Sequence, residues 1–574
     1  MPDLQAIQNR NYDLIVIGGG INGAATARDA ALRGLSVLLL EKNDFAGGTT
    51  SWSTRLVHGG LRYLEYFEFS LVRESLRERE ILLRTAPHLV KPIQMTIPIY
   101  GGGSRQYWEI QAGMLLYDTL SYDKSLPNHR MLPAPKFRQL FRAVDHVAAK
   151  GAAQYYDGQA EYAERLCLEI VLDAQSAGAD VLNYTTVTDL ERQGDRITAL
   201  IAHHQKSEQT FTVTLPATAV VANISGPWVD RVLGLGKHAN STDDFGGDRK
   251  IGGTKGSHII VDPFPGAPDT ALYVEAKSDG RPYFIVPWLG QYLIGTTDLP
   301  YSGDLDTFKA DDAEVDYLLK ETNQVLPTAR LTREDVRFTY SGVRPLPYSE
   351  GKKAGSITRA HILHDHTREG VSNLLSLIGG KLTTHRQVGE EITDWAFKKR
   401  GQTAPACPTR DRPLPGCIFP DDDRVQQVFA QYGDRVAVQS LDYLNQVYGA
   451  NALNVLSLVD EAPELAQPIR PGRPEIKAQI VYAVRAEMAQ TLLDITRRRT
   501  TLAMAGNYGF DILPALSEIL QRYCDWSSEH CQQQQQDYRA FMEANCIPDY
   551  ALTASAPSDA SVRSVAVATA DTSL

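Results

Sequence analysis

The stretch from Tyr12 to Glu41, YDLIVIGGGINGAATARDAALRGLSVLLLE, decides the fold of this chain. An apolar run at 12–17 precedes a glycine-rich turn, and a second apolar run at 36–40 follows an alanine-rich segment that Gly34 closes. Uninterrupted apolar strands joined through a helix are typical of a parallel sheet that is covered on both faces. The pattern therefore predicts a βαβ unit with a helix from Asn22 to Arg33.

Glycines occupy the turn of this unit with the spacing GxGxxG, at Gly18, Gly20 and Gly23. In this context the first glycine makes the turn, the second lets the backbone approach a pyrophosphate, and the third lets helix and strand pack closely. The start of the following helix supplies unpaired N–H groups for phosphate oxygens. Glu41 ends the second strand and is placed to accept both hydroxyls of an adenosine ribose, which argues against NADP. The segment predicts a dinucleotide site.

Two further segments favour a flavin over a nicotinamide dinucleotide. Residues 47–53 are small and hydroxylated, so they offer N–H and O–H donors to a pyrophosphate or an isoalloxazine ring. Residues 378–384 (IGGKLTT) form a second glycine turn, suited to the flavin pyrimidine edge or the ribityl chain. A cofactor site bracketed in this way predicts FAD. The predicted cofactor contacts are Gly18, Gly20, Asn22, Gly23, Glu41, Thr49, Thr50, Ser51, Ser53, Gly59, Gly226, Gly380, Lys381, Leu382 and Thr383.

The composition argues against several other classes of protein. The chain has 574 residues and a net charge of −11, which indicates neither a nucleic-acid binder nor a polybasic membrane clamp. Its six cysteines include no CxxC pair, so neither a zinc knuckle nor a disulfide framework is expected, and no metal site is predicted. The N-terminus lacks the apolar core of a secretory signal, and no apolar stretch is long enough to span a bilayer. A cytoplasmic protein is expected, or one peripheral on the inner face of the cell membrane.

The chain divides at a proline-rich linker. Five prolines lie between 405 and 420, after a long region in which helical and β patterns alternate. Residues 421–550 have mostly helical patterning and predict a separate α-helical domain. Residues 551–574 are rich in alanine, serine and threonine and contain no aromatic residue, which predicts a disordered tail.

Six segments occur in a fixed order along the chain. They are residues 12–42, STRLVHGGLRYLE (53–65), KGSH (255–258), IGTTD (294–298), TYSGVRPL (339–346) and GGKLTT (379–384). Together they closely resemble the FAD-dependent glycerol-3-phosphate dehydrogenases. The resemblance is strong over about 11–400 and extends more weakly into the helical region through 481–488 and 498–500.

The resemblance implies a fold similar to D-amino-acid oxidase. An α/β, Rossmann-type FAD-binding domain is interleaved with an α+β substrate domain built on an antiparallel sheet, and a C-terminal helical domain follows. The FAD-binding parts are expected at about 11–75, 150–235 and 340–400, and the substrate parts at about 76–149 and 236–339. The resemblance also implies oxidation of sn-glycerol 3-phosphate to dihydroxyacetone phosphate, by hydride transfer from C2 to flavin N5, with electrons passed to a membrane quinone.

Residues in these segments suit a substrate with a phosphate and a secondary alcohol. A guanidinium group binds phosphate in a bidentate geometry that lysine cannot copy. Arg62 and Arg344 have apolar neighbours in the sequence and are expected to be buried beside the phosphate. Arg359, in the segment Ile357-Thr358-Arg359, is a further predicted substrate contact. Tyr63 and Lys381 complete the predicted substrate contacts.

Loss of a hydride from C2 is easier when the hydroxyl proton leaves with it, so the site needs a base or a polarising cation. His58 and His258 have the right titration range for the base. Arg344 could instead stabilise the developing alkoxide. Lys381 either stabilises the reduced flavin or contacts the substrate, and the sequence does not rank these uses.

Other interpretations stay open. The chain could be an oxidase that passes electrons from glycerol 3-phosphate to O2, an amine or amino-acid oxidase, or a flavin-binding protein without catalysis. Residues 107–117 fit either an interfacial membrane helix or core packing. The run 497–499 (RRR) fits either lipid phosphates or a contact between domains, and a homodimer is also left open. His361, His364 and His366 are expected at the surface.

Overall fold

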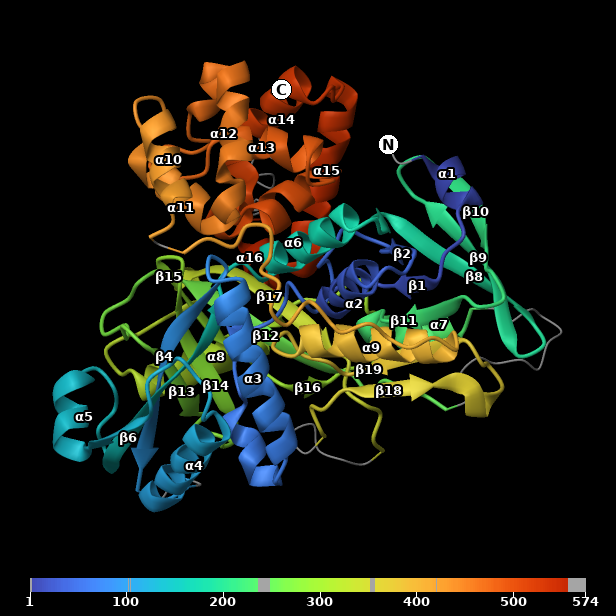
Figure 1. Ribbon diagram of the computed structural model, residues 1–574. Coiled ribbons are helices and arrows are strands. Elements are labelled where there is room, and N and C mark those ends of the chain that lie inside the picture. Colours follow the sequence, from blue (N-terminus) through green and yellow to red (C-terminus); the bar gives the residue numbers. More distant parts are fainter. Residues whose placement is uncertain are drawn as a thin grey trace, which may run out of the picture.

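The computed structural model describes residues 3–101, 103, 105–235, 248–350, 357–419 and 421–555. The predicted βαβ unit is confirmed: β1 (Leu14–Ile17) and β2 (Val37–Leu40) pair in parallel, and α2 (Ile21–Leu32) connects them. Both strands are buried along their whole length, as their apolar sequences require. They lie in a six-stranded sheet with the order β18-β19-β11-β1-β2-β7 (Figure 1).

Helices cover this sheet, and α2 contacts both α6 and α9. A smaller antiparallel sheet of β8, β9 and β10 is inserted between β7 and β11, and it contacts the N-terminal helix through β10. The elements of this FAD-binding part, beyond the first unit, are α1 (Leu4–Asn9), α6 (Ala163–Ser176), β7 (Asp180–Leu182), β8 (Thr185–Gln193), β9 (Arg196–His204), β10 (Gln209–Thr214), β11 (Val220–Asn223), η2 (Gly226–Trp228), α7 (Val229–Leu233), β18 (Ile362–Asp365), η5 (His366–Glu369), β19 (Leu374–Ile378) and α9 (His385–Lys399).

A ten-stranded sheet forms the second part of the molecule. Its strands follow the order β16-β12-β15-β14-β13-β4-β6-β3, with β17 beside β12 and β5 beside β6. The pairs are antiparallel as predicted, except that β13 and β4 are parallel. The elements here are β3 (Leu56–Val57), η1 (Leu61–Tyr66), α3 (Phe69–Thr85), β4 (Val90–Tyr100), α4 (Tyr107–Leu120), β5 (Arg130–Pro133), α5 (Ala134–Leu140), β6 (Ala149–Ala160), β12 (Thr254–Val261), β13 (Ala271–Glu275), β14 (Pro282–Trp288), β15 (Gln291–Gly295), β16 (Leu299–Pro300), α8 (Asp312–Val325), η3 (Arg333–Asp335) and β17 (Val336–Arg344).

Three strands differ from the expected division into parts. β3 and all but the first residue of β6 lie in ranges expected for the FAD-binding part, and β17 crosses the expected boundary at 340, but all three pair in the large sheet. Local sequence pattern does not distinguish the two sheets here, so only the long-range pairing assigns these strands. The first residues of the predicted substrate segment 236–339, at 236–247, lie outside the described residues.

Beyond the proline-rich linker the chain is helical, as predicted, and forms a body on one side of the two sheets (Figure 1). The last helix, α16, continues to Ser555 and so passes the expected boundary at 550, while 556–574 of the predicted tail lie outside the described residues. None of the described helices has the length and apolar character needed to cross a membrane. The elements are α10 (Asp423–Tyr432), α11 (Val438–Tyr448), η6 (Gly449–Asn451), α12 (Ala452–Glu461), η7 (Pro463–Ala466), α13 (Lys477–Arg485), η8 (Asp494–Arg499), η9 (Leu502–Met504), η10 (Asn507–Ile512), α14 (Leu513–Tyr523), α15 (Ser528–Asn545) and α16 (Asp549–Ser555).

A buried ion cluster joins this helical domain to the FAD-binding part. Asp44, just after β2, accepts from Arg498 Nε at 2.8 Å and from Arg499 Nη1 at 2.6 Å. Arg497 donates to Glu164 at 2.9 Å, and Glu164 also pairs with Arg55. All six side chains are buried. The arginine run therefore makes the domain contact, and its alternative interpretation as a lipid-phosphate site is wrong.

Electrostatics keep this cluster ionised. Burial alone would raise the pKa of Asp44, but Arg499 and Arg498 lower it below the ordinary value of an aspartate. The carboxylate is therefore charged at neutral pH and contributes stability that is lost only as the pH falls through its depressed pKa. Removing one partner of such a cluster leaves a buried charge without compensation, which is far more costly than losing a surface pair.

We expect Asp44→Asn to lower the free energy of unfolding by about 3–5 kcal/mol, because two buried guanidinium groups lose their shared carboxylate. Thermal unfolding of the FAD-loaded protein would measure the loss. Asp262→Asn is the matched control, since Asp262 pairs with Arg337 on the surface and its loss should cost less than about 1 kcal/mol. Equal melting temperatures for the two variants would contradict a stabilising role for the cluster.

Candidate active site

The glycine turn between β1 and α2 is shaped by close backbone contacts. Gly18 has φ +113°, and a Cβ atom there would lie 2.6 Å from the carbonyl oxygen of Ile224 at the end of β11. A Cβ atom on Gly23 would lie 1.9 Å from the carbonyl oxygen of Gly18. Gly20 caps α2 without a side-chain hydrogen bond, so the helix start faces the adjoining cavity with backbone N–H groups. This is the geometry that phosphate groups require.

Glu41 is fixed at the end of β2. Its Oε2 accepts from the backbone N–H of Gly19 at 2.7 Å, and its Oε1 accepts from Asn43 N–H at 2.8 Å. Burial raises the pKa of Glu41, and the two N–H groups oppose that effect. The carboxylate lines the cavity and is held where it can accept from two ribose hydroxyls.

The second glycine turn closes the same cavity from the other side. Gly379 and Gly380 have φ +85° and +93°, and a Cβ atom on Gly380 would lie 2.7 Å from Asn22 Nδ2. The Oδ1 atom of Asn22 is buried and has no hydrogen-bond partner among the described residues. Thr383 Oγ1 accepts from the backbone N–H of His58 at 3.2 Å. The cavity, about 340 Å³, thus spans both predicted halves of a dinucleotide site and offers an unsatisfied polar atom to a ligand.

Most of the predicted site residues line this cavity. They are Gly18, Gly20, Asn22, Glu41, Thr49, Thr50, Ser53, His58, Tyr63, Gly226, His258, Arg344, Arg359, Gly380, Lys381, Leu382 and Thr383. The hydroxyl groups of the 47–53 segment are partly engaged already, since Thr50 Oγ1 accepts from Ile21 N–H at 3.1 Å and Thr49 Oγ1 donates to the carbonyl of Val343 at 2.7 Å.

Four predicted residues do not line the cavity. Gly23 serves the helix packing described above, and the buried Ser51 hydroxyl donates to the carbonyl of Ala46 at 2.6 Å. The N–H of Gly59 donates to the hydroxyl of Tyr117 at 3.0 Å. Arg62 is only half-buried and donates to the Tyr66 hydroxyl at 3.3 Å, so its expected burial is wrong. Sequence spacing cannot distinguish such supporting positions from contacting ones.

Two arginines and one aspartate form a charged group at the far end of the cavity. Arg344 Nη1 donates to Asp298 Oδ1 at 3.1 Å, and Arg359 Nη2 lies 3.5 Å from Asp298 Oδ2. Arg344 also donates to Thr296 Oγ1 at 3.1 Å. Burial lowers the pKa of Arg344, and Asp298 opposes that effect. Asp298 thus holds two guanidinium groups at the cavity wall, and a guanidinium group can bind a phosphate in a bidentate geometry.

Asp298 was missed as a site residue although it belongs to the quoted IGTTD segment. The available signal was an acid that follows a predicted strand, now β15, within a segment already quoted for the resemblance. Only the folded chain shows that its two carboxylate oxygens face two different arginines.

Tyr63 and Lys381 complete this end of the cavity. Lys381 Nζ donates to Ser75 Oγ at 2.6 Å and lies 5.1 Å from the centre of the Tyr63 ring. Burial lowers the pKa of Lys381 to about 8, with Glu74 and Glu68 opposing the shift. The lysine is therefore a positive charge whose titration lies close to physiological pH.

Both predicted histidines are neutral in this environment. Burial lowers the pKa of His58, and it lowers that of His258 well below the ordinary value, with Arg344 adding to the second effect. The Nε2 atom of His258 lies 2.9 Å from Thr54 Oγ1, and its ring stacks on Tyr340 with centroids 4.7 Å apart. Its Nδ1 atom has no hydrogen-bond partner among the described residues. A neutral imidazole is the form that accepts a proton.

Comparison with known proteins agrees with this geometry. Residues 13–395 match the family of FAD dependent oxidoreductases, and residues 407–531 match the C-terminal domain of alpha-glycerophosphate oxidase. The fold and site therefore define a flavoprotein oxidoreductase that uses FAD. The chain belongs to the FAD-dependent glycerol-3-phosphate dehydrogenase family.

Individual relatives span nearly the whole chain. It is 60% identical over 555 residues to a glycerol-3-phosphate dehydrogenase of Synechocystis, covering 96% of this chain and 100% of that one. It is 37% identical to a D-erythritol 1-phosphate dehydrogenase of Brucella abortus, covering 85% and 94%. The glycerol-3-phosphate dehydrogenase from Bacillus halodurans, solved with FAD, superposes with a TM-score of 0.72 at 27% identity, covering 94% and 96%.

Proposed function

We propose that this chain oxidises sn-glycerol 3-phosphate to dihydroxyacetone phosphate and passes the electrons to a membrane quinone. The observation that carries the proposal is that Arg344 and Arg359, both in contact with Asp298, line one cavity with the neutral His258 and the dinucleotide turn. The names of the relatives support the substrate. Membership of the FAD dependent oxidoreductase family supports a redox reaction that uses FAD.

The substrate phosphate would be held by the two guanidinium forks of Arg344 and Arg359. Tyr63 and Lys381 border the same end, while Arg62 would have to turn from Tyr66 to reach it. A phosphate at the arginines orients the rest of a short substrate, so its C2 hydroxyl comes within reach of the wall that carries His258. FAD, when bound, supplies the acceptor of the hydride from C2.

We assign the hydroxyl proton to His258 rather than to His58. His258 stacks on Tyr340, and Thr54 fixes the orientation of its ring through Nε2. Because Nε2 makes that contact, Nδ1 is the ring nitrogen that has no partner among the described residues. Nδ1 would therefore accept the proton of the substrate hydroxyl. Arg344 is close enough to lower the pKa of His258 and would stabilise negative charge that develops on the oxygen.

An exposed apolar surface supports peripheral docking on a bilayer. Tyr66, Phe67 and Phe69 are exposed on η1 and the start of α3, and Trp108 and Leu115 are exposed on α4. The contacts of α4 with both η1 and α3 bring together the elements that carry these side chains, and α4 lies far from the C-terminal helical domain (Figure 1). Core packing accounts for the inner face of α4, where Met114 and Tyr117 are buried, but not for the exposed Trp108 and Leu115. This surface adjoins the end of the cavity proposed to bind the substrate, because Tyr63, which lines that end, also lies on η1.

The first test is anaerobic addition of glycerol 3-phosphate to the FAD-loaded protein, which should bleach the visible flavin absorbance. D-erythritol 1-phosphate, added separately, should bleach it more slowly. Re-oxidation by a quinone analogue should outpace re-oxidation by air. Hydrogen peroxide formed in stoichiometric amounts would establish the oxidase alternative, and no bleaching by either phosphate ester would reject the proposed substrate class.

The pH dependence tests the role of Lys381. Because its pKa is about 8, the ammonium loses its charge as the pH rises through that value, and kcat/KM for glycerol 3-phosphate should fall there. Lys381→Arg retains the charge and should move the alkaline limb to higher pH. If the limb stays near pH 8 in this variant, another group controls it.

Membrane docking is tested by flotation with anionic phospholipid vesicles. The wild-type protein should float with the vesicles, and Trp108→Glu combined with Leu115→Glu should reduce the floated fraction at least about tenfold, since charges are costly at the interface. Val438→Glu is the control, because Val438 is equally exposed but lies on α11 of the helical domain. A wild-type protein that stays with the soluble fraction would reject docking.

A further inference from the structure

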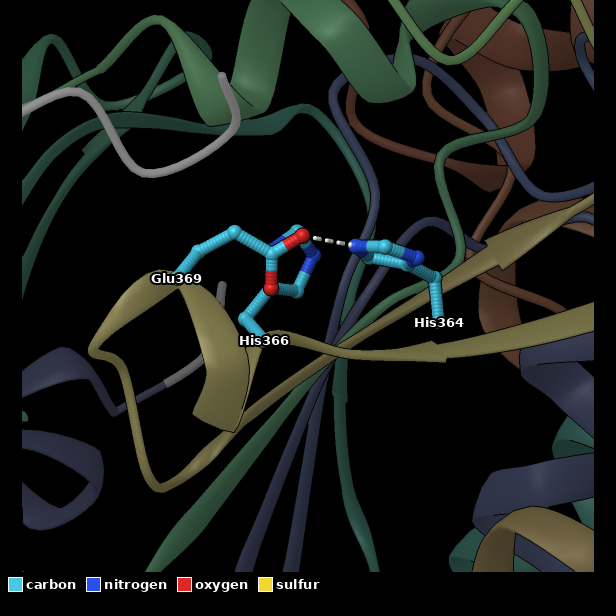
Figure 2. A group of neighbouring side chains, drawn as sticks. All are labelled: His364, His366 and Glu369. Carbon is cyan, nitrogen blue, oxygen red and sulfur yellow. Dashed lines mark hydrogen bonds and ion pairs between the residues drawn. The ribbon is translucent and has the colours of Figure 1, made fainter. Parts of the chain in front are cut away.

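We propose that His364, His366 and Glu369 bind one zinc ion at the turn between β18 and β19. Figure 2 shows the three side chains converging on one point from the end of β18 and from η5. One ligand atom from each lies within 4.8 Å of the others. No other group of this kind was found among the described residues.

The structure corrects the sequence expectation for two of these histidines. His366 is fully buried rather than on the surface, and His364 is half-buried. The partner acid that the sequence did not identify is Glu369, whose Oε1 lies 2.6 Å from His364 Nε2. The two imidazole rings are 4.6 Å apart and nearly perpendicular, so they direct nitrogens to a common point instead of stacking.

The surroundings hold the group in place. Ser376 on β19 contacts His366 Nε2 at 2.9 Å, the kind of outer contact that orients a histidine ligand. The turn is fixed by the hydrogen bond from Val371 N–H to the carbonyl of His366 at 3.0 Å. Arg192 donates to the carbonyl of Gly370 at 2.8 Å. The ligands are therefore held in place by the fold before any metal binds.

The donor set selects the metal. Two imidazoles and one carboxylate match zinc, whose fourth ligand can be water, whereas magnesium and calcium prefer oxygen donors. The half-buried His364 and Glu369 leave the point open to an ion from solvent.

One nearby cation competes for the carboxylate. Lys250 Nζ lies 3.6 Å from Glu369 Oε1 and would be repelled by a bound dication. This competition gives the proposal a distinctive signature, because removal of Lys250 should tighten zinc binding whereas removal of a ligand should abolish it. A simple histidine–glutamate ion pair predicts neither effect.

The test is a zinc titration of the FAD-loaded protein after chelation and gel filtration, in competition with a chromophoric zinc indicator. Wild type should bind one Zn²⁺ per chain above any background, and added Zn²⁺ should raise its melting temperature, whereas Mg²⁺ should do neither. His364→Ala and Glu369→Gln should each weaken that site at least about tenfold. Lys250→Met should strengthen it.

His203→Ala is the matched control, because His203 on β9 lies 3.5 Å from Glu208 but belongs to no group of three possible ligands among the described residues. This variant should bind zinc like wild type. Retained flavin absorbance in every variant shows that the FAD-binding part is intact. Equal zinc stoichiometry and affinity in wild type, His364→Ala and Glu369→Gln would overturn the proposal and leave the group as an ion pair only.

Discussion

The buried ion cluster around Asp44 is the constraint on which the cofactor side of the molecule depends. A buried carboxylate is tolerated only with close partners, and here those partners come from Arg498 and Arg499, at the other end of the chain. Arg497 extends the contact, since it bonds the carbonyl of Ser51 and lies 4.5 Å from the ring of Trp52. The 44–53 segment thus owes its position to the C-terminal helical domain.

That dependence explains how a helical domain contributes to a site that it does not line. No residue beyond Thr383 borders the cavity among the described residues, yet Thr49, Thr50 and Ser53 border it on a segment held by the helical domain. The large sheet contributes the opposite wall through His258 and Arg344, on the paired strands β12 and β17. Three parts of the fold therefore set the geometry of one cavity.

Local pattern was enough to predict much of this structure. The apolar runs and glycines of 12–41 determine the βαβ unit because the backbone contacts at Gly18 and Gly23 exclude a side chain. The cavity residues outside that unit came from motif resemblance. What the sequence could not supply was long-range pairing: β3, β6 and β17 pair in the large sheet, and Asp298 contacts both Arg344 and Arg359. Each of these contacts joins residues far apart along the chain. The contact of Arg62 with Tyr66 is local, and there the apolar sequence neighbours led to a wrong expectation of burial.

The buried ion cluster around Asp44 also affects when the cofactor site can form during protein synthesis. Its partner Arg498 follows 454 residues later, so a ribosome adding roughly 5–20 residues per second leaves the carboxylate without it for roughly 20–90 s. During that interval the N-terminal βαβ unit has been synthesised in full, but the 44–53 segment beside it lacks the arginines that hold it. Stable capture of FAD is therefore tied to the end of translation. A chain truncated before 497 would still contain residues 44–53 but would lack the three arginines that hold this segment in place.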